Sequence, residues 1–146
     1  QKFKISYGLD ERNLRALFRK AEQATGSSAR RLVTLLESRL DNVIFRLGFA
    51  PSRAMARQLV SHGHIVVNSH RVRSPGYEVG VGDVIALRPE SAGKNTFRDL
   101  DEHLKKHEAP SWLHLDVAKR EGRVLAAPED VAMPFEVNLL VESFSK

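Results

Sequence analysis

The hydrophobic periodicity of the chain changes at Gly63. Before this glycine, apolar residues recur every three or four positions, as along one face of a helix, whereas the residues after it follow a strand-like pattern rich in β-branched side chains. With 146 residues, of which 42% are hydrophobic, the chain can bury the core of one domain or of two small ones. The order of the two patterns predicts an α+β fold in which helices pack on a small sheet.

Cap and stop residues divide the helical part of the chain into three runs. Asp10 and Ser52 are suitable N-caps, because their side-chain oxygens can accept hydrogen bonds from the first free amides of a helix. Glycine ends helices readily, and Pro51 disfavours helix at the residue before it. The predicted helices run from Asp10 to Gly26, from Ser27 or Ser28 towards Gly48 with a break near Arg39-Leu40-Asp41, and from Ser52 to His62-Gly63.

The remainder of the chain predicts short strands and one more helix. Asn68-Ser69 has the composition of a hairpin turn between two strand-like segments. A helix of about three turns is expected around Leu100, ending before Pro110. The predicted strands are 64–67, 70–72, 84–87, 112–115, 122–125 and 137–144.

The net charge of +5 conceals two halves of opposite character. Residues 1–75 carry 14 Lys and Arg against 5 Asp and Glu, a net of +9, whereas residues 76–146 carry 9 against 13, a net of −4. No acid lies between Asp41 and Glu78, although eight arginines and histidines do. A basic stretch of this kind suits RNA that is recognised by its shape and backbone charge.

Two arginines of the third helix share a face with Ser61. Arg53 and Arg57 are four residues apart, so both can point outward, and each planar guanidinium can pair with two phosphate oxygens. For two arginines alone, a solvated helix face is the simpler interpretation. The basic and polar residues that follow favour RNA binding instead, and these are His62, His64, Asn68, Arg71 and Arg73. The apolar residues of the helix share another face that can pack on the preceding helix: Met55, Ala56, Leu59 and Val60.

The sequence offers little for other kinds of chemistry. Without cysteine, the chain has no disulfides and no Cys-ligated zinc. His62, His64 and His70 have no nearby acid to complete a metal site, and the pair His103 and His107 lacks the glutamate of the zinc-protease motif. No nucleophile elbow, paired carboxylates or phosphate loop is present. We therefore predict no enzyme activity, no catalytic residue, no metal, no cofactor and no small-molecule substrate.

The sequence also lacks membrane and export signals. No apolar run approaches the ~18 residues that would span a bilayer, and no secretory signal opens the chain. We therefore expect a soluble, cytoplasmic protein that contacts no membrane. The chain begins at Gln1 instead of Met, so we expect an N-terminally shortened form.

Residues 39–88 carry a specific motif. Their sequence is RLDNVIFRLGFAPSRAMARQLVSHGHIVVNSHRVRSPGYEVGVGDVIALR, and the combination of SRAMARQLVSHGHIVVN with VGDVI closely resembles the S-four RNA-binding domain. The flanking segments YGLDERNLRALFRKA, LLESRLDNVIFRLG, PSWL and NLLVESFSK resemble the bacterial family of small-subunit ribosomal protein number four. The resemblance implies that the RNA-binding domain, 39–88, with two helices on a small, mostly antiparallel sheet, is inserted into a helical or mixed domain formed by 1–38 and 89–146.

The same resemblance implies a structural component of the small ribosomal subunit. Members of this family bind 16S-type ribosomal RNA directly and nucleate assembly of the subunit body. They also contact small-subunit ribosomal protein number five, influence translational accuracy, and lie near the path by which messenger RNA enters. Carried over by position, the RNA-binding residues are Arg39, Ser52, Arg53, Arg57, Ser61, His62, His64, Asn68, Arg71 and Arg73, with Lys2, Lys4, Tyr7 and Arg12 from the first segment.

Two departures from the family pattern carry expectations of their own. Ser69 stands where members usually have Gly after the asparagine of the hairpin turn, so we expect a longer or slightly strained turn. Members also carry a further N-terminal segment, sometimes with zinc-binding cysteines, so any zinc site would lie in that segment and not in this chain.

Two other classes of protein use the same RNA-binding module. One is the RNA-modifying enzymes, such as pseudouridine synthases and methyltransferases, but the 58 residues after position 88 are too few for their catalytic domain and show neither a catalytic aspartate nor a cofactor loop. The other is small ribosome-associated stress factors, against which the long helical segment before residue 39 argues. A ribosomal protein is therefore the preferred interpretation.

Overall fold

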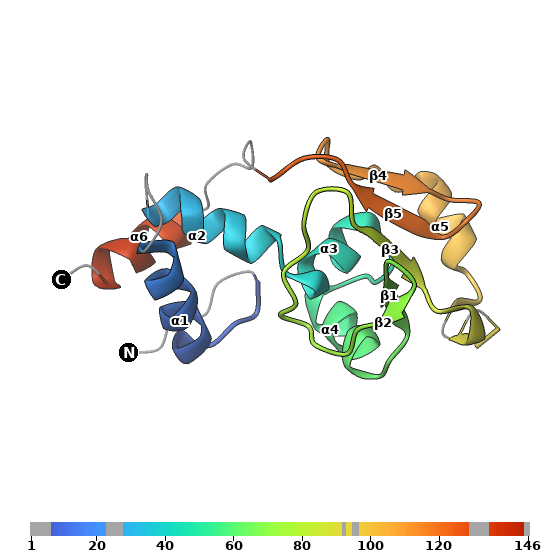
Figure 1. Ribbon diagram of the computed structural model, residues 1–146, viewed down its shortest axis with the longest axis horizontal. Coiled ribbons are helices and arrows are strands. Elements are labelled where there is room, and N and C mark those ends of the chain that lie inside the picture. The colour runs from blue at the N-terminus through green and yellow to red at the C-terminus, as the bar shows by residue number, and fades with distance from the viewer. Residues whose placement is uncertain (1–6, 23–27, 92, 95–96, 129–134, 145–146) are drawn as a thin grey trace. The chain divides into compact units, whose positions relative to one another are not determined.

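The computed structural model describes residues 7–22, 28–91, 93–94, 97–128 and 135–144. The chain divides into two compact units, which are described separately (Figure 1). The helical unit comprises Gln1–Ser38 and Pro128–Lys146, and the mixed unit comprises Arg39–Ala127. The mixed unit is thus an insertion between the two parts of the helical unit.

Three helices form the described part of the helical unit: α1 (Glu11–Glu22), α2 (Ser28–Glu37) and α6 (Phe135–Phe144). The predicted cap of α1 is confirmed, because Asp10 Oδ1 accepts a 3.0 Å hydrogen bond from the backbone amide of Asn13. The predicted stop of this helix, Gly26, lies outside the described residues.

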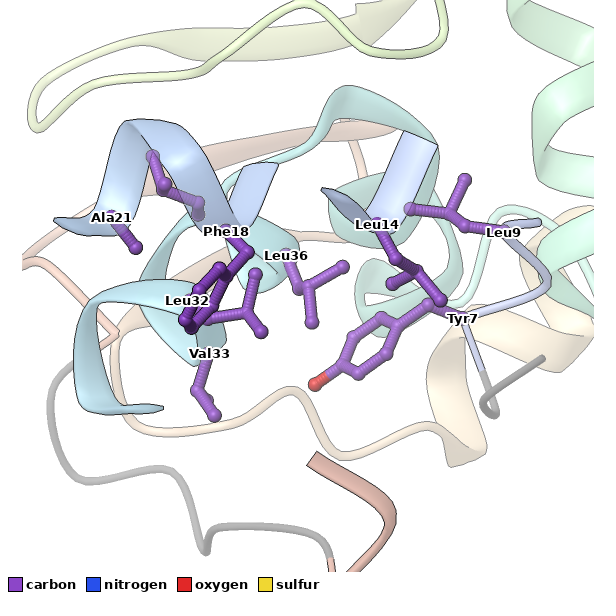
Figure 2. Packing of buried hydrophobic residues seen from close by; sticks show 9 residues of the cluster. Tyr7, Leu9, Leu14, Phe18, Ala21, Leu32, Val33 and Leu36 are labelled. Carbon is purple, nitrogen blue, oxygen red and sulfur yellow. The ribbon is translucent and has the colours of Figure 1, made fainter. Parts of the chain in front are cut away.

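Apolar side chains of α1 and α2 meet in the core of the helical unit. Figure 2 shows Phe18 of α1 beside Leu32 and Val33 of α2, with Leu14 and Leu36 further along the same contact. All five side chains are at most 4% exposed. Their spacing of three or four residues along each helix explains why these segments are helical, since only a helix brings them onto one face.

The strand predicted at 137–144 is wrong, because Phe135–Phe144 forms the helix α6. The β-branched and aromatic residues of this segment favoured a strand, but Val141 and Phe144 are three residues apart, as helical packing requires. Both are partly buried against the core of α1 and α2, and the Phe144 ring meets the Phe18 ring edge-on with 5.5 Å between centroids. Packing against two other helices therefore outweighs the local strand propensity.

Helices α3 (Leu40–Leu47) and α4 (Arg53–Ser61) open the mixed unit. The predicted break before α3 is confirmed, because Arg39 has an extended backbone with φ −67° and ψ 141°. Helix α3 ends at Gly48, whose φ of 90° is the left-handed conformation that glycine tolerates best. The predicted cap of α4 is also confirmed, because Ser52 Oγ accepts a 3.1 Å hydrogen bond from the Met55 amide.

Five strands form one antiparallel sheet in the order β2-β1-β3-β5-β4 (Figure 1). The hairpin predicted after Gly63 is confirmed, since β1 and β2 pair with Val67 opposite His70. With the helices, this sheet confirms the α+β class. The strands are β1 (Ile65–Val67), β2 (His70–Arg71), β3 (Val84–Leu87), β4 (Leu113–Asp116) and β5 (Glu121–Val124).

Helix α3 packs on one face of the sheet, and α4 packs beside α3. Alternate strand residues such as Ile65 and Ile85 are fully buried, as expected for a sheet with one covered face. Gly122 of β5 allows the closest approach, because a Cβ at this position would overlap the side chain of Leu47 in α3.

The compact mixed unit extends past the boundary predicted at residue 88. Strand β5 pairs with β3, Val84 lying opposite Arg123, so the segment around 113–124 completes the sheet. Between β3 and β4 in the chain lie a 3-10 helix, η1 (Pro89–Ser91), and the helix α5 (Leu100–Lys106). Helix α5 is the further helix predicted from the sequence, and it is shorter than expected. Arg120 Nε lies 2.8 Å from Asp101 Oδ1 and ties the β4–β5 turn to α5.

Candidate nucleic-acid interface

The two predicted arginines of α4 lie against α3. Arg53 Nε donates a 2.9 Å hydrogen bond to Asn42 Oδ1, and its guanidinium carbon lies 4.6 Å from the centroid of the Phe45 ring, a cation–π contact. Arg57 Nε lies 3.5 Å from Asp41 Oδ2, and 35% of the Arg57 side chain is exposed. Both arginines are therefore half-buried and oriented by α3, where we had expected them to project outward, away from the core.

Arg39 belongs to the same cluster and is more deeply buried. Its Nε and Nη2 donate to Oδ1 and Oδ2 of Asp41 at 3.2 and 3.1 Å, a bidentate pair. The Arg39 side chain is 15% exposed and lies beside Gly76, where an added Cβ would come within 3.1 Å of the guanidinium. Internal contacts thus occupy most of Arg39, and little of it remains for an external ligand.

The buried stripe of α4 is narrower than predicted. Ala56, Leu59 and Val60 are buried, but Met55 is 38% exposed. At 100° per residue, Met55 lies at the edge of the stripe away from Arg53 and Arg57, so α3 does not cover it. The arginines occupy the other edge, which faces the polar start of α3.

Asn68 and Ser69 form a two-residue hairpin turn with φ values of 50° and 69°. Positive φ at both positions is typical of a primed turn, so of the two expectations the strained turn is the one observed. The Asn68 side chain donates a 3.0 Å hydrogen bond to Asp83 Oδ1 and accepts one of 2.9 Å from the Val84 amide. Asn68 thus fastens the hairpin to the start of β3, a structural role that the RNA-binding prediction had not foreseen.

Two further arginines, from the hairpin segment, lie next to the residue that follows the end of α4. A Cβ on Gly63 would lie 3.2 Å from Arg73 Nε and 3.4 Å from Arg71 Cδ. Both arginines are exposed, and so is His62 at the end of α4. The helix and the hairpin therefore present one basic surface. We call it the α4–hairpin surface and define it by Ser52, Arg53, Arg57, Ser61, His62, Arg71 and Arg73.

His64 mainly joins β1 to the segment that follows β3, and we do not include it in this surface. Its Nδ1 lies 2.7 Å from Ser91 Oγ, and its ring meets the Phe97 ring edge-on at 5.5 Å. Burial lowers the pKa of His64 below its ordinary value of 6.5, and the nearby charge of Lys94 acts in the same direction. A neutral, half-buried imidazole is poorly suited to binding phosphate as a cation.

The RNA-binding residues predicted from the first segment differ in their exposure to solvent. Tyr7 is 3% exposed, and its hydroxyl donates a hydrogen bond to the buried carboxylate of Glu37, so its side chain belongs to the core of the helical unit. Figure 2 shows the Tyr7 ring next to Leu14 in the core of the helical unit. Arg12 is exposed on α1. Lys2 and Lys4 lie outside the described residues.

Two polar residues of α3 were missed by the sequence-based prediction. Asp41 and Asn42 are 3% and 1% exposed, and between them they contact Arg39, Arg53 and Arg57. The segment LDNVIF carried the signal, since it places two polar residues on a helix that is otherwise apolar on its buried side. We had interpreted this position only as a break between helices.

The described residues contain no other obvious binding chemistry. No three His, Cys, Asp or Glu side chains among them are arranged to hold a metal ion. His107 of the second histidine pair is a packing residue, because its Nε2 lies 2.7 Å from the Arg46 carbonyl oxygen and its ring lies against Gly48. Of the helices described, none is long and apolar enough to cross a membrane.

A family model described as the S4 domain matches residues 38–85. The matched region nearly coincides with the predicted domain at 39–88 and contains α3, α4 and the β1–β2 hairpin. Together with the basic α4–hairpin surface, this match defines a class: proteins that carry an S4-type RNA-binding domain.

Curated relatives resemble the chain over its full length. They include the small ribosomal subunit protein uS4 of Chloroflexus aurantiacus, 47% identical over 150 residues that cover 100% of this chain and 73% of the relative. The uS4 protein of Roseiflexus castenholzii is also 47% identical with the same coverage. That of Caldicellulosiruptor saccharolyticus is 45% identical over 148 residues, covering 100% of this chain and 71% of the relative. The chain belongs to the family of small ribosomal subunit protein uS4.

Family membership confirms the predicted resemblance and the role as a ribosomal protein of the small subunit. The relatives are named as ribosomal proteins and not as enzymes, so the prediction that the chain is not an enzyme is confirmed. The two alternatives that share the RNA-binding module, an RNA-modifying enzyme and a ribosome-associated stress factor, are set aside by the same comparison.

Proposed function

We propose that the α4–hairpin surface binds 16S-type ribosomal RNA directly and that this binding nucleates assembly of the subunit body. The observation that carries the proposal is that Arg71 and Arg73 lie beside Gly63, just past the end of the helix that carries Arg53 and Arg57, within an S4 domain. Two elements of different geometry thus offer cations to one ligand. Such a surface suits a folded RNA, whose phosphates follow a fixed path in space.

The surface favours phosphate as its main ligand. Arginine presents a planar set of N–H donors that can pair with two phosphate oxygens, and four arginines at one surface provide this chemistry repeatedly. Ser61 and His62 continue the surface at the end of α4. The Ser61 hydroxyl already donates to the carbonyl oxygens of its own helix, at 3.0 Å to that of Arg57, so its lone pairs face an external donor such as a ribose hydroxyl.

The dependence of RNA affinity on salt tests this proposal. For Arg57→Gln, the slope of log affinity against log salt should become shallower by about 0.7 to 0.9. The variant makes one phosphate contact fewer, so its binding releases fewer counterions. Arg123→Gln is the matched control, because Arg123 is exposed on β5, which β1 and β3 separate from the hairpin strand β2, and it is not part of the α4–hairpin surface. Equal slopes for the wild type and Arg57→Gln would overturn the assignment of this surface.

The proposal extends to the partners that the family resemblance implies. These are small-subunit ribosomal protein number five, with which the chain influences translational accuracy, and messenger RNA near its point of entry into the subunit, in the cytoplasm. The net charge of −4 over residues 76–146 supports protein contacts for this half, because excess acid repels an RNA backbone. Co-sedimentation of reconstituted subunits with and without the partner protein tests this contact.

A further inference from the structure

Two adjacent residues at the start of α3 support the arginines of the α4–hairpin surface from below. Asp41 contacts both Arg39 and Arg57, and Asn42 accepts a hydrogen bond from Arg53. We call these five residues the arginine cradle. Its two central members are almost completely buried, whereas Arg57 keeps 35% of its side chain exposed.

The cradle contains an acid, Asp41, at a surface that is proposed to attract RNA. Attraction of RNA by charge alone would favour no acid at this position. A carboxylate beside arginines reduces the positive potential that attracts phosphate, and its burial carries a desolvation cost. The hydrogen bond from a first-turn amide of α3 accounts for only part of the bonding of Asp41. Asp41 Oδ1 accepts a 2.7 Å hydrogen bond from the Asn42 amide, but Oδ2 lies toward the guanidinium groups of Arg39 and Arg57. Any contribution of Asp41 to RNA binding is therefore made through the orientation of Arg39 and Arg57.

The contacts leave each surface arginine with a defined orientation. Arg57 meets Asp41 through Nε, and Arg53 meets Asn42 through Nε while its guanidinium lies over the Phe45 ring. A contact through Nε fixes the plane of the guanidinium, and therefore the directions of its Nη donors. Arginine that is already ordered loses less conformational entropy when it binds a ligand.

We propose that Asp41 and Asn42 are positioning residues for RNA recognition. They hold Arg57 and Arg53, one helical turn apart, so that the Nη donors meet the phosphates of one folded RNA shape. This inference rests on the proposed function and deepens it. Its consequence is that the cradle contributes to discrimination between 16S-type ribosomal RNA and other RNA, while the overall positive charge supplies affinity for any RNA.

The test compares two RNAs at one salt concentration, using the full chain. One RNA is a 5′-domain fragment of 16S-type rRNA, and the other is a duplex of equal length and unrelated sequence. Asp41→Asn keeps the size of the side chain and removes its charge. Affinity for the rRNA fragment should fall by about tenfold or more, because the arginines lose their orientation. Affinity for the unrelated duplex should stay equal or rise, because one negative charge is lost.

Asp101→Asn is the matched control. It removes another carboxylate that pairs with an arginine of the mixed unit, since Asp101 Oδ1 lies 2.8 Å from Arg120 Nε. This pair joins α5 to the β4–β5 turn and is not part of the α4–hairpin surface. The ratio of the two RNA affinities should therefore be the same in Asp101→Asn as in the wild type.

Arg57→Lys is a second variant in case Asp41→Asn does not fold. Lysine keeps the charge of this partly exposed position but lacks the forked donors, so the affinity ratio should fall while binding to the unrelated duplex stays unchanged. The inference is overturned if the folded variants keep the wild-type ratio, or if Asp41→Asn changes both affinities by the same factor. If the wild type itself does not prefer the rRNA fragment, the proposed function fails instead.

Discussion

His64 joins the first strand of the sheet to the segment that follows β3. Its side chain meets Ser91 and Phe97, and its backbone carbonyl accepts a 2.7 Å hydrogen bond from the Arg88 amide. Sequence inspection placed His64 among the RNA-binding residues because it lies near the basic helix. The contacts that occupy it come from residues at least 24 positions away along the chain, and no local pattern predicts them. Asn68, held by Asp83, is a second example.

We predict that the stability of the fold decreases in acid partly through His64. The pKa of His64 is lowered in the folded chain, so as the pH falls through 6.5 the unfolded chain takes up a proton more readily, and the free energy of unfolding falls. Urea unfolding at about pH 7.5 and pH 5.5 measures this loss for the wild type and for His64→Gln. The wild type should lose more stability across this interval than the variant. Equal losses would contradict the pKa direction.

The hairpin and the β3–β5 contact are the elements on which the mixed unit depends. The hairpin brings Arg71 and Arg73 to the end of α4, and its turn holds Ser69 at a φ of 69°. Strand β5 extends the sheet beyond the matched S4 domain and lies against α3 at Gly122. Each contact depends on one small residue, so each can be tested by a single substitution.

Ser69→Gly should stabilise the protein by about 0.5–1 kcal/mol. The left-handed conformation costs a non-glycine residue on the order of 1 kcal/mol or more, part of which is offset by the greater freedom of glycine in the unfolded chain. Denaturant unfolding monitored by circular dichroism measures the change. Ser74→Gly is the control, because Ser74 is exposed and has no positive φ, and it should be neutral or destabilising. Destabilisation by Ser69→Gly would contradict the strained turn.

Gly122→Ala should destabilise the protein by about 1–3 kcal/mol, the usual effect of overpacking, because the new methyl group overlaps Leu47. In the background of Leu47→Ala the same substitution should cost less, and this coupling distinguishes a steric contact from a general effect on β5. Gly93→Ala serves as the control, since a Cβ there meets nothing within 4 Å. Equal costs in both backgrounds would argue against the close approach of α3 and β5.

The elements that sequence predicted well are those with local signals. Helices α3 and α4 have a glycine stop or a serine cap, and the β1–β2 hairpin has its turn residues, so each could be placed from a few neighbours. Helix α6 lacked such a signal. Its residues suit a strand locally and become helical by packing on α1 and α2. The basic surface was predictable for the same local reason, whereas its support by Asp41 and Asn42 depends on how two helices meet.

At the scale of the whole molecule, charge is divided along the chain. Residues 1–75 carry a net charge of +9 and contain α4 and the hairpin, whereas residues 76–146 carry −4. The mixed unit spans the boundary between these halves, with α4, β1 and β2 in the first and β3, β4 and β5 in the second. This division agrees with one RNA-binding surface and separate surfaces for other partners.

Reversal of an acid in the second half should not weaken RNA binding. Glu102 is exposed on α5, outside the α4–hairpin surface. We expect Glu102→Lys to leave affinity for a 16S-type rRNA fragment unchanged or slightly higher, because added positive charge favours association with RNA at long range. Filter binding at moderate salt measures the affinity of the wild type and of Glu102→Lys for this fragment. A clear loss of affinity would indicate that α5 contacts the RNA.

Directed hydroxyl-radical cleavage tests whether the α4–hairpin surface faces ribosomal RNA. Because the chain has no cysteine, a single introduced thiol can carry the iron chelate without competing sites. Ser61→Cys places the chelate on the surface, and His114→Cys places it at an exposed position on β4, the edge strand at the opposite end of the sheet from β2. With a 16S-type 5′-domain fragment, we expect discrete strand cleavage from position 61 and little from position 114. Equal cleavage from both positions, or none from position 61, would contradict this expectation.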